Sequence, residues 1–134
     1  MKEVIIIFSI LFFVMFSYSG VTKITSFTDK VNTLYKKLDS KVPISLLNFA
    51  MVCVILLEIL GPIIIISRLI AGKKSSEILK TLSNITFGFF ILFLIVVTLL
   101  YHPFATNKPI PFFSNLTTLS GMVLLLIISN SDIY

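Results

Sequence analysis

Residues that usually build catalytic and metal centres are scarce in this chain. It has one cysteine, Cys53, one histidine, His102, one arginine, Arg68, and no tryptophan. A single cysteine excludes an internal disulfide, a CxxC redox pair and a cysteine-based zinc site, and a single histidine excludes a multi-histidine metal site. Cys53 lies inside an apolar run, where a small packed core residue is expected.

Charged residues are also few, and apolar residues dominate. Of the 134 residues, 57% are hydrophobic and 13% are charged, and the mean hydropathy is +1.06. A soluble protein of this size could not bury so much apolar surface, so we expect one membrane domain over residues 1–134. The net charge of +5 comes from lysines beside apolar runs. This placement is typical of lipid headgroup contacts and argues against nucleic-acid binding.

Four runs are long and apolar enough to cross a bilayer, which needs roughly 20 apolar residues of helix. They cover residues 4–22, 44–67, 81–101 and 112–131. The first run also resembles a cleavable signal peptide, but we interpret it as the first span. The sequence therefore predicts an all-α integral membrane protein, an up-down bundle of four transmembrane helices with both ends on one side. Basic residues are nearly balanced between the two sides, and the lysine cluster after Ser67 favours the ends inside.

Residues 24–39, between the first two spans, have the pattern of an amphipathic helix. Apolar residues recur there at spacings of three and four: Ile24, Phe27, Val31, Leu34 and Leu38. Joined directly to a span, such a helix is expected to lie in the membrane interface. The alternative is a connector packed on the bundle. The lysines expected to contact headgroups here and after the second span are Lys30, Lys36, Lys37, Lys73 and Lys74.

Glu58 is the only charge in the second span. Insertion of a carboxylate at the centre of a helix costs about 2.5–3.5 kcal/mol, so Glu58 is expected to face protein and to be paired or protonated. Gly61 and Pro62, one turn later, allow close packing and a kink. Glu58 lies roughly 13 Å before Ser67 along the helix. Antiparallel packing would bring other polar groups to this depth, as a packing element or as a proton or ligand site: Ser9, Asn84, Thr86 and Ser129.

A second polar group is expected at the opposite face of the bundle. It would gather residues from the ends of three spans: Ser17, Ser19 and Lys23, then Tyr101 and His102, then Asn115. His102 with Lys23 could bind an anion or a quinone oxygen at headgroup level. The alternative is that His102 is an ordinary interfacial residue.

Several motifs together resemble the DoxX family. They are FSYSGVTKITSF at the end of the first span, LLEILGPIIII in the second, LLYHPF at the end of the third and FFSNLTTLSGMVLLL in the fourth. The similarity extends from about Phe16 to Leu126. It implies a small four-helix membrane protein related to subunits of thiosulfate:quinone oxidation, with other members in thiol or oxidative-stress systems. The family-like polar positions are Lys23, Glu58, His102 and Asn115.

Three function classes follow from these features. The first is a non-catalytic accessory subunit of a larger membrane complex, such as a respiratory or other redox assembly. The second is a quinone-linked oxidoreductase subunit, although one cysteine gives the chain no dithiol. The third is a small proton-coupled carrier based on Glu58. No phosphate-binding loop, nucleophile elbow or zinc signature is present, so we expect no intrinsic cofactor, metal or catalysis. Bound lipid, bound quinone and other membrane subunits are the expected partners, in a mitochondrial inner or bacterial cytoplasmic membrane.

Overall fold

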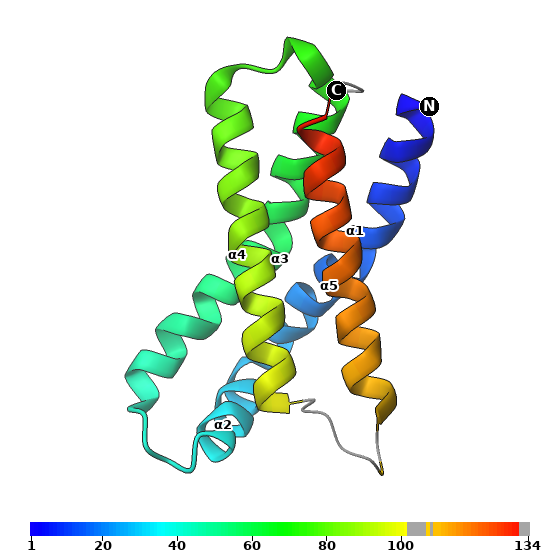
Figure 1. Cartoon of the computed structure of the whole chain (residues 1–134). Coiled ribbons are helices and arrows are strands. Elements are labelled where there is room, and N and C mark those ends of the chain that lie inside the picture. The colour runs from blue at the N-terminus through cyan, green and yellow to red at the C-terminus, as the bar shows by residue number, and fades with distance from the viewer. Residues whose placement is uncertain (102–106, 108, 132–134) are drawn as a thin grey trace.

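The computed structural model describes residues 1–101, 107 and 109–131. Its four long helices form an up-down bundle (Figure 1): α1 (Lys2–Thr25), α3 (Ile44–Ala71), α4 (Glu77–Tyr101) and α5 (Pro109–Ser129). Each is long and apolar enough to cross a membrane. A short helix, α2 (Phe27–Lys37), follows α1, and a 3-10 turn, η1 (Gly72–Lys74), follows α3. The prediction of an all-α bundle with four candidate spans is confirmed.

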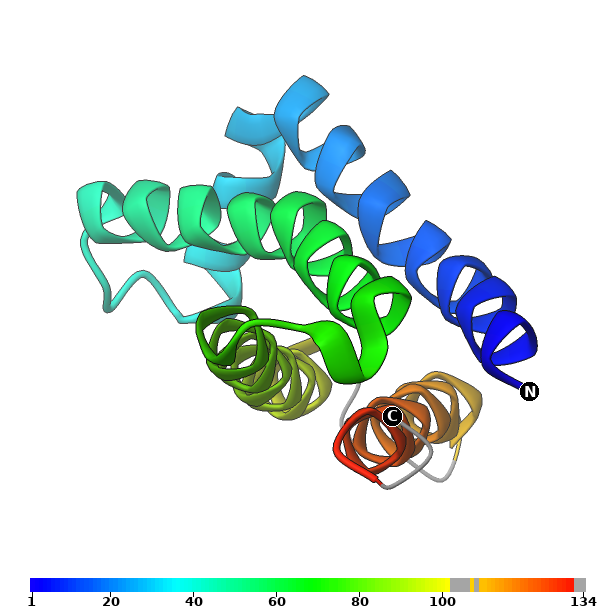
Figure 2. The same ribbon diagram turned by 90° about the horizontal axis from the view of Figure 1, so that it is seen from above.

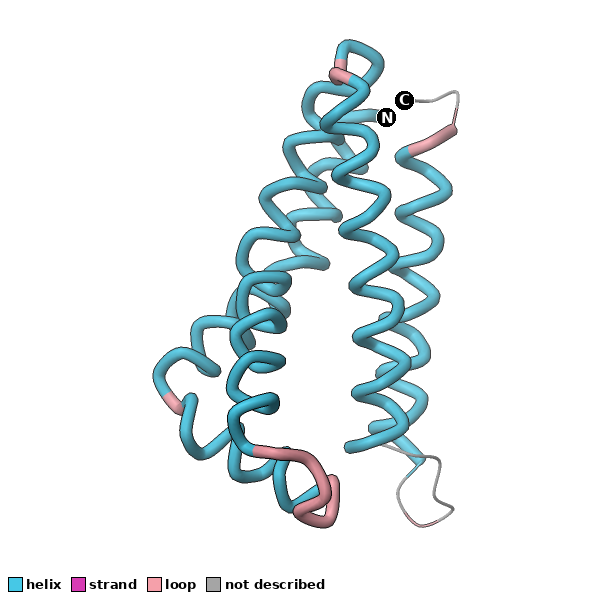
Figure 3. The backbone as a smooth tube through the Cα atoms, turned by 90° about the vertical axis from the view of Figure 1, so that its left-hand side faces the viewer, coloured by secondary structure: helices cyan, strands magenta, loops and turns pink. Residues whose placement is uncertain are grey.

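The long helices pack in the order α1, α3, α4, α5, as seen from above in Figure 2. The start of α1, the turn η1 and the end of α5 lie at one end of the bundle, which we call the terminal end (Figure 1). The helix α2 lies at the other end, which we call the α2 end (Figures 1 and 3). The two outer helices, α1 and α5, leave a groove between them.

The bounds of α3 follow from local chain chemistry. Pro43 is its N-cap, with extended backbone angles, and Gly72 is its C-cap with a φ of 58°, a left-handed value that glycine adopts without strain. The helix runs to Ala71, past the predicted end of the span at Ser67, because Arg68 is buried inside the bundle instead of facing water.

The amphipathic helix is shorter than predicted, and its apolar side packs on protein. Ser26 separates α1 from α2, so Ile24 belongs to α1, where it is 56% exposed. The rest of the apolar stripe packs against the first half of α3, with Val31 buried against Leu47, Met51 and Ile55. The packed-connector alternative therefore describes the apolar side of α2, while its lysines remain exposed.

Cys53 corrects one expectation. It is exposed on the surface of α3, and the prediction of a packed core residue is wrong. Met51 and Ile55, one turn apart, carry the face of α3 that packs against α2. A residue midway between them points to the opposite side of the helix.

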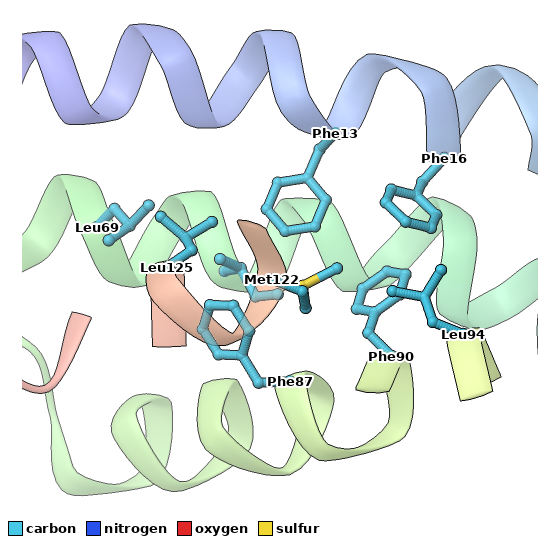
Figure 4. Close-up of a cluster of buried hydrophobic side chains, with 9 residues drawn as sticks. Phe13, Phe16, Leu69, Phe87, Phe90, Leu94, Met122 and Leu125 are labelled. Carbon is cyan, nitrogen blue, oxygen red and sulfur yellow. The ribbon is translucent and has the colours of Figure 1, made fainter. Parts of the chain in front are cut away.

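Aromatic residues of α1 and α4 fill the centre of the bundle. Phe13 and Phe16 of α1 meet Phe90 of α4, with ring centroids 5.7 and 5.0 Å apart (Figure 4). Met122 of α5 is fully buried in the same cluster. Gly61 of α3 lies directly against the Phe90 ring, and a β-carbon at this position would be 2.5 Å from the ring carbon Cε2. This glycine therefore sets how closely α3 approaches α4.

Substitution of Gly61 by alanine tests this close approach. The Phe90 side chain is fully buried, so its ring cannot swing away, and we expect Gly61→Ala to lower the free energy of unfolding by about 1–3 kcal/mol. Gly88→Ala is the matched control, because a β-carbon there would have no neighbour within 4 Å. The control should be neutral or stabilising by up to about 1 kcal/mol through helix propensity. Unfolding titrations in mixed micelles give both values, and equal effects of the two substitutions would contradict this packing.

Candidate functional site

The main polar site inside the bundle joins α1 to α3. Lys23 Nζ donates hydrogen bonds to both carboxylate oxygens of Glu58, at 3.0 Å to Oε1 and 2.9 Å to Oε2. It donates a third to Ser19 Oγ at 2.6 Å, and Ser19 Oγ in turn donates to Glu58 Oε1 at 3.3 Å. Glu58 is only 2% exposed, whereas the Lys23 side chain is 18% exposed. As expected, the acid faces protein and has a partner.

The local sequence explains how the two helices come this close. A β-carbon at Gly20 would lie 2.8 Å from Ile59 Cγ1 and 3.2 Å from Glu58 Cβ, so only glycine fits at this crossing. Small residues at helix crossings in membranes allow such close approach of the backbones. Pro62 lies four residues after Glu58 and has no N–H, so it donates no helical hydrogen bond to the Glu58 carbonyl.

The partners of Glu58 differ from those that the depth argument predicts. Ser9 donates instead to Ile5 O, Thr86 donates to Leu82 O, and Asn84 accepts from Asn130. Ser129 likewise bonds to its own helix, at Leu126 O. The predicted partners assume that neighbouring spans begin and end at the same level. In the structure, α1 is displaced along α3, so that Lys23, near the end of α1, meets the middle of α3.

The second predicted group does not assemble among the described residues. Lys23 is occupied by Glu58, so its charge is not available to an anion or a quinone. The Tyr101 ring instead lies below Lys37, whose Nζ is 5.7 Å from the ring centroid. Asn115 Nδ2 is buried without a hydrogen-bond partner. His102 lies outside the described residues.

The lysines expected to contact lipid headgroups are placed at the two ends of the bundle. Lys73 and Lys74 are exposed in η1, at the terminal end. Lys30, Lys36 and Lys37 are exposed on α2, at the opposite end. Their exposure is compatible with headgroup contacts at both membrane surfaces, which stay a prediction.

Arg68 is a second buried charge that sequence reasoning misses. It is 5% exposed, and its guanidinium donates to Gly72 O at 2.9 Å, Ser75 Oγ at 3.2 Å and Ser129 O at 3.0 Å. The carbonyls at the ends of α3 and α5 carry partial negative charge, which favours a cation there. Within the described part of the chain no carboxylate pairs with it. The sequence signal is the single arginine among lysines, since a planar fork of donors suits several acceptors at once.

Comparison of the chain with known protein families, curated proteins and solved structures found no match. The resemblance to the DoxX family therefore stays a prediction. Over residues 1–101, 107 and 109–131, no three His, Cys, Asp or Glu side chains gather as a metal ion requires. Because Lys23 and Ser19 donate hydrogen bonds to the two oxygens of Glu58, this arrangement holds α1 against α3.

Breaking the Lys23–Glu58 pair from either side should give unequal losses. Lys23→Met leaves a carboxylate buried and uncompensated, and we expect it to lower the free energy of unfolding by about 3–5 kcal/mol. Glu58→Gln leaves Lys23, which is partly exposed, so about 1–2 kcal/mol is expected. The double variant should cost little more than Glu58→Gln, so the coupling energy should be about 3–4 kcal/mol, close to the cost of Lys23→Met alone. Additive losses in unfolding titrations would show that the pair is not coupled.

Replacing Arg68 tests its three hydrogen bonds at the terminal end of the bundle. Arg68→Lys keeps the charge but cannot reach Gly72, Ser75 and Ser129 with one ammonium group. We expect a loss of about 1.5–3 kcal/mol in the free energy of unfolding. Lys73→Gln, an exposed change five residues on, should stay within about 0.5 kcal/mol. If Arg68→Lys has the same free energy of unfolding as the wild type, the positive charge and not the guanidinium geometry stabilises this end of the bundle.

Proposed function

We propose that this chain is a non-catalytic accessory subunit of a larger membrane complex, with a respiratory or other redox assembly as the favoured setting. The observation that carries the proposal is that the buried acid Glu58 is paired within this chain. Lys23 and Ser19 together donate three hydrogen bonds to the two oxygens of Glu58, so the acid serves the packing of α1 on α3.

The surfaces of the bundle support the same proposal. The groove between α1 and α5 is lined by apolar side chains apart from Ser9, whose hydroxyl is hydrogen-bonded to Ile5 O. The connections between helices are short, and the chain has no extramembrane domain within its described residues. A protein built in this way would act by packing against other membrane subunits. The outer surfaces of its four long helices would make these contacts.

A quinone-linked subunit is the second candidate, and one observation favours it. Asn115 Nδ2 is a buried donor without an acceptor among the residues that the structure describes, and a quinone carbonyl is a suitable acceptor. Neither Lys23 nor Tyr101 joins Asn115 in a shared site, so this candidate rests on a single side chain. A proton-coupled carrier would use Glu58, which is instead paired with Lys23.

The native mass of the protein extracted in a mild detergent tests the proposed function. We expect this 15.0 kDa chain to migrate within a much larger complex, with its partner subunits identified by mass spectrometry. Deletion of the chain should lower the amount of assembled complex. Asn115→Leu should leave assembly and quinol-dependent turnover unchanged. Recovery of the chain alone would overturn the accessory role, and loss of turnover in Asn115→Leu with normal assembly would favour the quinone role.

A further inference from the structure

The buried apolar residues of the protein form two separate clusters, and α3 contributes to both. Ile65 and Leu69, in the second half of α3, pack with side chains of α1, α4 and α5. Met51 and Ile55, in the first half, pack with Val31 of α2. The two halves of one helix therefore belong to different packing units. We call residues 27–55, which comprise α2 and the first half of α3, the α2 unit.

The junction between the two halves of α3 has little buried packing and an incomplete set of helical hydrogen bonds. Of residues 56–60, only Glu58 is buried. Pro62 has no N–H to donate to the Glu58 carbonyl, and its ring crowds that carbonyl, which is how proline bends a helix. Figures 1 and 2 show that α3 changes direction along its length and that its first half leans away from α4. A change in this bend would move the α2 unit.

The Lys23–Glu58 pair lies across this junction. Glu58 precedes Pro62 and would move with the α2 unit, whereas Lys23 belongs to α1, which packs in the other cluster. Glu58 lies roughly 6 Å before Pro62 along α3, so a change of about 10° in the bend would move it by about 1 Å. The hydrogen bond from Ser19 Oγ to Glu58 Oε1 is already 3.3 Å long and would be lost. The bonds to Glu58 therefore oppose a change in the bend.

The connections of the α2 unit to α1 and α4 permit such a movement. Ser26 joins α1 to α2 and belongs to neither helix. At the other end of α2, Lys37 Nζ lies 5.7 Å from the centroid of the Tyr101 ring of α4. A cation–π contact at an exposed position contributes only about 0.5–1 kcal/mol.

We propose that Gly61 and Pro62 form a hinge about which the α2 unit moves against the rest of the bundle, and that the Lys23–Glu58 pair is the latch that holds the observed position. The position of α2 and of its exposed lysines then depends on an ion pair inside the bundle. The hinge does not rest on the accessory role, because it is tested by distances within the purified chain.

Distances between two spin labels, measured by double electron–electron resonance on the full chain in lipid nanodiscs, test the hinge. Cys53→Ser, at an exposed position, first removes the single cysteine. Leu46→Cys with Leu99→Cys is the test pair, with one label on each side of the hinge. Ile70→Cys with Leu99→Cys is the control pair, with both labels outside the α2 unit. The three labelled positions are 55%, 68% and 58% exposed, in the order Leu46, Leu99 and Ile70, so labels there should not disturb the core.

The latch is released by Glu58→Leu, which leaves no acceptor for Lys23 or Ser19. Leu46 lies roughly 24 Å from Pro62 along α3, so a change of about 10° in the bend moves its label by about 4 Å. We expect both pairs to give one narrow distance before the latch is released. Glu58→Leu should shift or broaden the test distance by about 4 Å and leave the control distance unchanged.

Pro62→Ala separates the hinge from the latch. It restores the N–H that Pro62 lacks, so Glu58→Leu with Pro62→Ala should return the test distance to its narrow value. Glu77→Leu is the matched control for loss of a carboxylate. The Glu77 side chain is 88% exposed, and both distances should stay as in the wild type.

Three results would overturn the hinge. The first is a test distance that Glu58→Leu leaves unchanged, since the pair would then hold nothing in place. The second is a double variant that stays as broad as Glu58→Leu alone, because the movement would then occur elsewhere in the chain. The third is equal broadening of the test and control distances, which would indicate a general loosening of the bundle.

Discussion

A carboxylate inside a bilayer must find a partner of opposite charge or a donor, and in this protein that requirement fixes the register of α1 on α3. Glu58 has an acceptable position only if Lys23 reaches it, and Lys23 lies near the end of α1. The last turns of α1 must therefore lie beside the middle of α3. The first half of α3 would then present bare apolar side chains, and α2 covers them. One ion pair thus accounts for the placement of both helices.

Lys23, which is partly exposed, and Arg68, which is buried, illustrate two ways of neutralising positive charge inside the bundle. Lys23 meets a full negative charge and needs one partner residue, with Ser19 completing its bonds. Arg68 meets only main-chain carbonyls and a hydroxyl, each with partial charge, and needs three of them. The difference follows from side-chain shape. A compact ammonium suits one carboxylate, whereas a planar guanidinium distributes its donors over several acceptors.

The four spans could be predicted from the sequence because length and hydropathy alone decide whether a helix can cross a bilayer. The bounds of α3 are also local, since Pro43 caps its start and Gly72 its end. The partner of Glu58 was not, because depth along one helix does not reveal how far a neighbouring helix slides. That displacement depends on Gly20, whose close contact with Ile59 appears only in three dimensions. The burial of Arg68 could not be predicted, because nothing in the neighbouring sequence indicates that Ser129, on another helix, supplies a carbonyl for it.

The positions of the two charge sites along the chain have a consequence for biosynthesis. Both members of the Lys23–Glu58 pair are present once the first half of the chain has been made, so this charge can be neutralised before α4 and α5 exist. The hydrogen bonds of Arg68 form later, because one of its acceptors is the carbonyl of Ser129, at the end of α5. The helices α1 and α3 can therefore form a stable hairpin early. The terminal end of the bundle therefore reaches its full set of hydrogen bonds only when α5 is present.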